Sequence, residues 1–116
     1  MKTLLAASVL LLAPLAAHAG CASTDFAIQD FKVGAAGGRL SLKGQLANHC
    51  AAAAAAQIQI DAKDSTGHVL QSKKGWPAGT TNIAPGQAVE FDLGRLFRYQ
   101  SDMQSYTVSV VDVRAW

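Results

Sequence analysis

Residues 40–46 read LSLKGQL, and leucine or glycine alternates with a polar side chain throughout this stretch. An apolar residue at every second position is typical of a β-strand with one buried face. Residues 25–33, DFAIQDFKV, have a similar apolar pattern, and residues 34–38, GAAGG, separate the two stretches. Because glycine adopts the positive φ angles that a tight turn requires, we expect residues 25–47 to form an antiparallel hairpin.

Four more stretches have the composition of short strands bounded by turn-forming residues. They are residues 57–62, 68–74, 88–93 and 106–113. The last contains the longest run of β-branched residues, which suits a central strand. The alanines of residues 51–56 favour a helix, but the run is too short for a stable one, so we expect a loop or edge crossing there. This pattern predicts an all-β fold, a small immunoglobulin-like antiparallel β-sandwich of about six to seven strands.

Residues 1–19 have the features of a bacterial-type signal peptide. Lys2 supplies the positive charge, residues 4–17 are almost all apolar, and the small residues around Ala19 suit signal peptidase. A membrane anchor is the alternative, but a membrane span needs about 20 apolar residues and no basic stop-transfer cluster follows. We therefore expect residues 20–116 to form one exported domain, periplasmic or secreted.

The charges of this domain are nearly balanced. Lys2 is one of ten Lys and Arg residues and leaves with the signal peptide, so nine remain against eight Asp and Glu. They are scattered along the chain, and Lys73-Lys74 is the only adjacent basic pair. Without a basic stripe to neutralise phosphates, we expect neither nucleic acid nor an anionic membrane surface as a partner.

Cys21 and Cys50 are the only cysteines, and an even number in an exported chain predicts a disulfide. A hairpin loop centred near residue 36 would place Phe26 opposite Gln45 or Leu46 and bring the two cysteines together. The bond would close a loop of about 30 residues and contribute about 3–4 kcal/mol.

A lipid anchor on Cys21 is the alternative and would make the chain an outer-membrane lipoprotein. His18 stands three residues before Cys21, where lipoprotein signals usually have an aliphatic residue. Lipidation would also leave Cys50 as a free thiol. The sequence therefore favours the disulfide over the lipid.

The residues that carry chemistry form no recognisable catalytic or metal motif. His49 and His68 lack the further ligands that zinc requires. Asp61 and Asp64 resemble a calcium loop only in composition, and we expect Asp64 to organise a turn. A nucleophile elbow and a phosphate-binding loop are both missing from the sequence. We therefore expect no enzyme activity, metal or cofactor.

A group of aromatic and basic residues is the best candidate for an interaction surface, because Trp, Tyr and Arg anchor many protein interfaces. The alternative is that Trp76 and Phe97 close the ends of the sandwich. The candidate surface comprises Trp76, Arg95, Phe97, Arg98, Tyr99, Arg114 and Trp116.

The order of several landmarks resembles the FxLYD-type domain, an immunoglobulin-like β-sandwich of bacterial exported proteins. These landmarks are residues 44–48 (GQLAN), the strand at 58–62, the turn at 64–67 (DSTG), and residues 83–86 (IAPG) leading to Phe91. The signature of the family falls on Ile60, Ala62, Lys63 and Asp64, of which Asp64 matches by identity. The resemblance implies a binding or scaffold module without catalytic residues.

Together these observations predict a non-catalytic exported module of the bacterial envelope that binds another envelope protein or a cell-wall component. Two alternatives remain open: a lipoprotein accessory domain anchored through Cys21, and an inhibitor of a secreted hydrolase.

Overall fold

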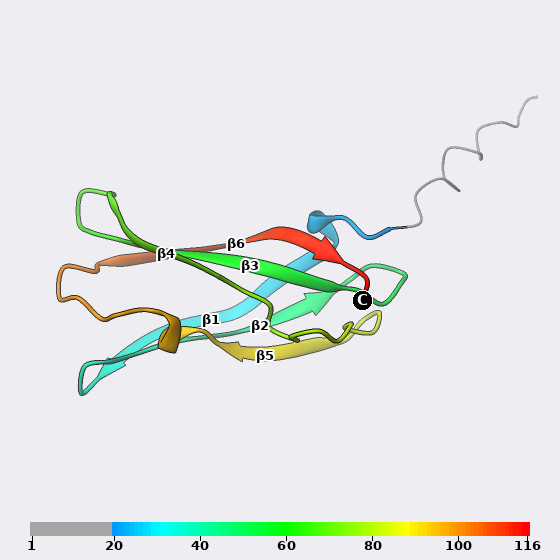
Figure 1. Cartoon of the computed structure of the whole chain (residues 1–116), viewed down its shortest axis with the longest axis horizontal. Helices are drawn as coiled ribbons and strands as arrows, with labels where there is room; N and C mark the ends of the chain where they lie inside the picture. The colour runs from blue at the N-terminus through cyan, green and yellow to red at the C-terminus, as the bar shows by residue number, and fades with distance from the viewer. Residues whose placement is uncertain (1–19) are drawn as a thin grey trace, which may run out of the picture.

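The computed structural model describes residues 20–116, and the expected signal peptide of residues 1–19 lies outside this range. Six strands make up most of the described chain (Figure 1). The strands are β1 (Phe26–Ala36), β2 (Arg39–Asn48), β3 (Ala55–Lys63), β4 (Val69–Gly75), β5 (Ala88–Asp92) and β6 (Ser105–Arg114). Two short 3-10 turns, η2 (Ser23–Asp25) and η3 (Gly94–Leu96), precede β1 and follow β5.

The strands form two antiparallel three-stranded sheets, ordered β1-β2-β5 and β4-β3-β6. The pairs β2-β5 and β3-β6 join strands that are not consecutive, so the chain crosses between the sheets as it does in immunoglobulin-like sandwiches. The predicted all-β fold, an immunoglobulin-like antiparallel sandwich, is therefore confirmed, with six strands. The β1-β2 and β3-β4 turns lie at one end of the molecule, and the C terminus lies at the other (Figure 1).

The core lies between the two sheets and follows the alternation that the sequence shows. In β2, Leu42 and Leu46 are fully buried, and in β3 the same holds for Ile58 and Ile60. Side chains from the connections close the core: Ile83, Leu93, Phe97 and Met103. Burial of a large aliphatic side chain contributes about 1.5–3 kcal/mol before entropy is subtracted, so these layers supply most of the driving force for folding.

The register of the first hairpin differs from the predicted one. Phe26 pairs with Asn48, rather than lying opposite Gln45 or Leu46. β1 continues through residues 34–36, and the turn consists of Gly37 and Gly38 alone, with φ angles of 60° and 77°. An irregularity between residues 29 and 32 moves the register one residue back toward the predicted pairing, because Asp30 adopts a φ of 53° and adds a residue to β1.

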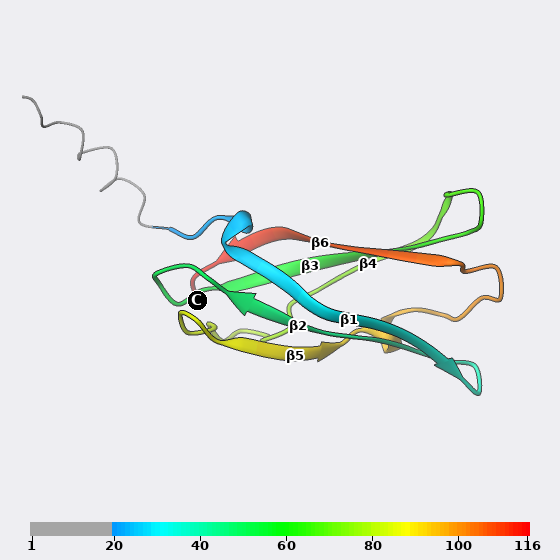
Figure 2. The ribbon, with the colours of Figure 1, turned by 180° about the vertical axis from the view of Figure 1, so that it is seen from behind.

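The position of β6 in its sheet also corrects the prediction. β6, the strand with the longest β-branched run, pairs only with β3 and is an edge strand of its sheet in both views (Figures 1 and 2). The central strand is β3, which begins within the alanine run expected to be a loop or edge crossing. Ala54, Ala55 and Ala56 are all buried. β-propensity reports the fit to a pleated, half-buried surface and does not determine the place of a strand in its sheet.

Candidate functional site

Three of the seven candidate surface residues meet near the C terminus. The indole rings of Trp76 and Trp116 make an edge-to-face contact with centroids 5.5 Å apart. The Arg114 guanidinium lies over both rings, 4.9 Å from the Trp116 centroid and 5.8 Å from that of Trp76. The backbone N–H of Trp116 donates to Oδ1 of Asn82 at 3.0 Å. We call Trp76, Arg114 and Trp116 the tryptophan cluster.

The tryptophan cluster lies at the end of the β4-β3-β6 sheet, on its outer face. Ala55 pairs with Arg114 in the sheet register and is only 1% exposed, although it does not belong to the core between the sheets. We attribute its burial to the cluster above it. Trp116 nevertheless remains 47% exposed. The cluster therefore covers a small part of its own domain and still presents a large aromatic surface to solvent.

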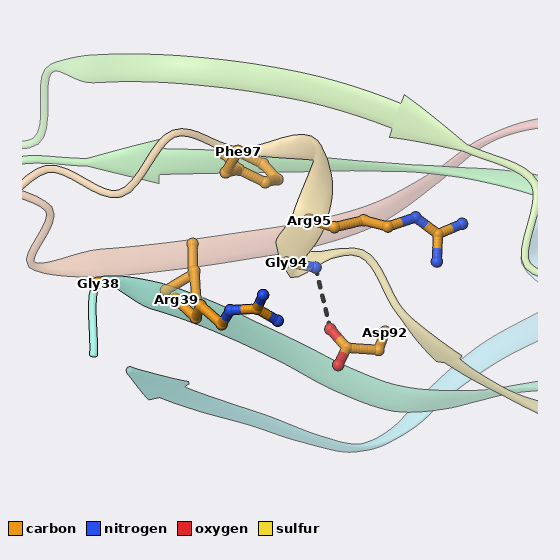
Figure 3. Close-up of a pocket in the computed structure, with 7 residues that line it drawn as sticks. Gly38, Arg39, Asp92, Gly94, Arg95 and Phe97 are labelled. Atoms are coloured by element: carbon orange, nitrogen blue, oxygen red, sulfur yellow. Dashed lines mark hydrogen bonds between the residues drawn. The ribbon is translucent and has the colours of Figure 1, made fainter. Parts of the chain in front are cut away.

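The other four candidate residues lie around η3, so the predicted surface is divided into two parts. Phe97 is buried and belongs to the core, where it closes the sandwich as the alternative interpretation expected. Arg95, Arg98 and Tyr99 are exposed. Figure 3 shows Arg95 extending away from η3, with Arg39 on the neighbouring strand β2 and Asp92 bonded to the backbone of Gly94.

Asp92 and Gly94 hold η3 against β2. Oδ1 of Asp92 accepts hydrogen bonds from the backbone N–H groups of Leu42 and Gly94, each at 3.0 Å. Figure 3 shows the bond from Gly94. Burial acts to raise the pKa of Asp92, but the hydrogen bonds from Gly94 and Leu42 and the charge of Lys43 outweigh it, so this pKa is lowered. Where β5 ends, the Asp92 carboxylate accepts the Leu42 N–H in place of a backbone carbonyl of the neighbouring strand. The same carboxylate binds the Gly94 N–H, and the chain turns into η3.

Gln71 of β4 fixes the segment that follows η3. Its Nε2 donates to the carbonyl oxygen of Arg98 at 2.6 Å and to Oε1 of Gln100 at 2.8 Å. Its Oε1 accepts from the backbone N–H of Arg98 at 3.0 Å. Two open cavities flank η3, one of about 420 Å³ toward Arg39 and one of about 500 Å³ toward Lys73. Arg39 and Lys73 were not among the candidate residues predicted from the sequence, because their proximity to η3 depends on contacts between separate strands.

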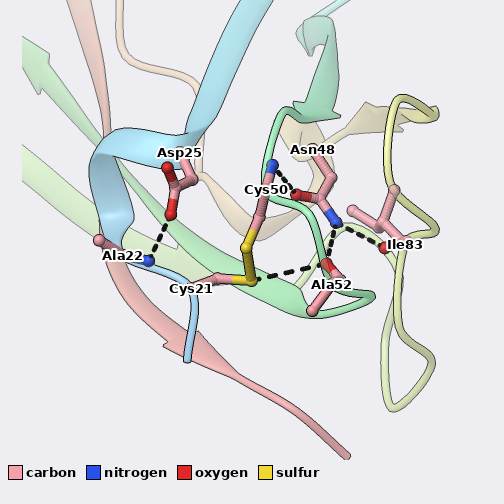
Figure 4. Close-up of a disulfide and its surroundings, with 7 residues drawn as sticks. All are labelled: Cys21, Ala22, Asp25, Asn48, Cys50, Ala52 and Ile83. Carbon is pink, nitrogen blue, oxygen red and sulfur yellow. Dashed lines mark hydrogen bonds between the residues drawn. A yellow bond between two sulfur atoms is a disulfide. The ribbon is translucent and has the colours of Figure 1, made fainter. Parts of the chain in front are cut away.

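The predicted disulfide is present between Cys21 and Cys50, whose Cα atoms are 5.8 Å apart (Figure 4). A structural disulfide indicates an oxidising compartment outside the cytosol. It also occupies the sulfur that a lipid anchor on Cys21 would require. Among residues 20–116, the one converging group of three possible metal ligands is Cys21, Asp25 and Cys50, and both of its sulfurs belong to the disulfide.

Asn48 organises the loop that carries Cys50. Its side chain is fully buried, and its Nδ2 donates to the carbonyl oxygens of Ile83 at 2.7 Å and Ala52 at 3.0 Å (Figure 4). Its Oδ1 accepts from the backbone N–H of Cys50 at 2.8 Å. One side chain thus joins the end of β2, the disulfide loop and the segment before β5.

Replacing Asn48 with alanine is therefore expected to lower the free energy of unfolding by about 2–3 kcal/mol, because the buried carbonyl of Ile83 and the part-buried backbone groups of Ala52 and Cys50 lose their partner. Urea denaturation of the oxidised protein measures the effect. Gln45→Ala is a suitable control, since Gln45 lies in the same strand and is only half-buried. Equal stability of the Asn48 and Gln45 variants would show that water replaces the amide without cost.

The remaining candidate residues lie apart. Oδ1 of Asp64 accepts from the backbone N–H groups of Thr66 and His68, which confirms the predicted turn. The Thr66 hydroxyl and the His68 backbone N–H lower the pKa of Asp64. His68 belongs to the β3-β4 turn, whereas His49 follows β2 next to Cys50, so the two histidines belong to loops at opposite ends of β3.

No helix within residues 20–116 is long and apolar enough to cross a membrane. No protein-family model, curated protein or solved structure matches this chain.

Proposed function

We propose that this protein is a non-catalytic binding or scaffold module of the bacterial envelope, periplasmic or secreted, whose partner is another envelope protein. The FxLYD-type resemblance is consistent with such a role. The observation that carries the proposal is the tryptophan cluster, in which two indole rings contact edge to face, a guanidinium lies over both, and Trp116 remains 47% exposed.

The residue types of the tryptophan cluster and the contacts that hold its side chains both suit a protein–protein interface. Trp and Arg are enriched among the residues that dominate binding energies. Arg114 is stacked on both rings and the Trp116 backbone is bonded to Asn82, so these groups have already lost much of their conformational freedom. A partner that binds them would therefore lose less entropy than one that has to order flexible side chains.

The border strand β6 leads directly into the cluster and supports the same proposal. Its residues Ser105–Val111 carry no charge, and Val111 is exposed. Long uncharged border strands present unpaired backbone groups that readily pair with another chain. β1 and η2 lie close to β6, so a partner that reaches the tryptophan cluster would pair with the part of this edge that they leave free.

Site-specific photocrosslinking in the native envelope tests the proposal. A photoreactive phenylalanine analogue at position 116 is expected to form an adduct of one defined mass, and Arg114→Ala in the same chain is expected to weaken it. The same analogue at His68, which is exposed in the β3-β4 turn, serves as the control. The proposal fails if position 116 gives no adduct, or if both positions give the same adducts.

A further inference from the structure

The inward side of β4 carries residues that are unusual for the inner face of a sandwich. Directly paired residues of antiparallel strands project to the same face of the sheet. Gln71 pairs with Ala62, Lys73 with Ile60 and Gly75 with Ile58, and these three β3 partners are fully buried in the core. The inward positions of β4 are therefore Gln, Lys and Gly, where an apolar pattern would normally continue.

Each of the three inward positions has a role in relation to η3. Gly75 leaves room for Leu93 and Leu96, whose side-chain carbons lie 3.1 Å and 3.7 Å from the position of an added Cβ. Gln71 binds the backbone of Arg98 and the side chain of Gln100. Lys73 lines the cavity between β4 and η3.

Three cationic side chains line this cavity, and no carboxylate does. The cavity has a volume of about 500 Å³, within the range of small-molecule sites, and is lined by Lys73, Arg95, Arg98, Gln71, Leu96 and Phe97. Among residues 20–116, the one contact within 4.0 Å between a basic and an acidic side chain joins Nδ1 of His68 to Oδ2 of Asp64. In the described chain, the positive charges of Lys73, Arg95 and Arg98 are therefore not neutralised by any acidic side chain within 4.0 Å.

Lys73 points inward on an edge strand, and this has an explanation other than ligand binding, because such a charge discourages pairing of the edge with another chain. That explanation accounts for Lys73 but not for Arg95 and Arg98, which come from a different segment. It also does not explain why Gln71 fixes the Arg98 backbone through two hydrogen bonds. Fixing the backbone that carries a cation reduces the entropy lost when that cation binds a ligand.

We propose that the cavity between β4 and η3 binds the phosphate group of an anionic ligand, through Lys73, Arg95 and Arg98. Arginine presents paired N–H donors that match phosphate oxygens, and lysine adds a compact charge. Leu96 and Tyr99 are 38% and 40% exposed on the same segment, so an apolar part of the ligand has a surface beside the charges. This site is separate from the tryptophan cluster and goes beyond the protein-binding function proposed above.

Two probes test the proposal and separate the possible sources of the phosphate. Inorganic pyrophosphate, followed by NMR titration, represents a soluble phosphate. Vesicles of phosphatidylglycerol and phosphatidylcholine in equal parts, compared in a flotation assay with vesicles of phosphatidylcholine alone, represent a lipid headgroup. Saturable binding to one probe supports the proposal and identifies the source.

The variants Lys73→Gln and Arg98→Gln are each expected to weaken binding to that probe about tenfold, since each removes one charge-assisted contact. Lys74→Gln is the matched control, because Lys74 pairs with Gln59 and lies on the opposite face of the same strand. Circular dichroism and the melting temperature verify that the variants are folded. Failure of both probes to bind, or an equal loss in the Lys74 variant, would overturn the proposal and leave the Trp116 crosslinking result unaffected.

Discussion

The substitution Gly94→Ala is expected to destabilise the protein by at least about 3 kcal/mol, at the upper end of the range for overpacking a well-filled site. A Cβ added at Gly94 would lie 2.5 Å from the carbonyl carbon of Leu40 and 2.9 Å from Cα of Ser41. Both atoms belong to the backbone of β2, so no side-chain rotation relieves the clash. Relief requires η3 to move away from β2, which would break the hydrogen bonds from Leu42 and Gly94 to Asp92.

Thermal denaturation followed by circular dichroism measures this effect, and the expected fall in melting temperature is about 15 °C or more. Gly34→Ala is the control, because its added Cβ would meet only Ser41 Cβ at an ordinary 3.8 Å. That variant should be as stable as the original chain. A Gly94 variant that melts within a few degrees of the Gly34 variant would mean that η3 is not held against β2 as described.

Removing the disulfide by the double substitution Cys21→Ser and Cys50→Ser is expected to cost about 3–4 kcal/mol in the chain-entropy treatment. The bond joins residues 29 positions apart, and its loss restores the conformational freedom of that loop in the unfolded chain. The effect is large for a domain of this size, because a small core leaves a narrow margin over conformational entropy.

Urea denaturation with and without a reducing agent distinguishes this cause from a local packing defect. The original chain should lose stability on reduction until it matches the double variant, and the double variant should not respond to the reducing agent. Intact mass adds a direct measurement: the oxidised protein is two hydrogens lighter than its reduced form. A diacylglyceryl adduct on Cys21 would instead contradict the disulfide.

The local patterns of the sequence were sufficient for the fold class. Alternation in residues 40–46 and 57–62 identified the faces of β2 and β3, because side chains of a strand point to opposite sides of its sheet. The two cysteines predicted the disulfide although the register was wrong. Phe26 pairs with Asn48, which would bring Cys21 level with a residue beyond Cys50. η2 forms a tight turn before β1 and thereby returns Cys21 to Cys50.

The candidate surface was predicted less completely. The sequence contained the aromatic and basic residues, but the burial of Phe97 was expected only under the alternative interpretation, in which it closes an end of the sandwich. It also gave no sign that the Trp116 ring contacts that of Trp76, forty positions earlier in the chain. These outcomes depend on which strands become neighbours, and non-local pairing leaves no periodic signal in a single sequence.

By itself, the sequence therefore determined the all-β class and the strands near their observed positions, because both follow from local periodicity, and it favoured the disulfide over a lipid anchor, because Cys21 and Cys50 are the only cysteines. Only the tertiary structure decided that β6 is an edge strand and that the first hairpin shifts in register at Asp30. It also decided that Lys73 lies with Arg95 and Arg98 beside η3. The charges looked scattered along the chain because their grouping comes from the packing of β4 against a segment more than twenty residues later. That packing is a balance of many long-range contacts, which no short stretch of sequence contains.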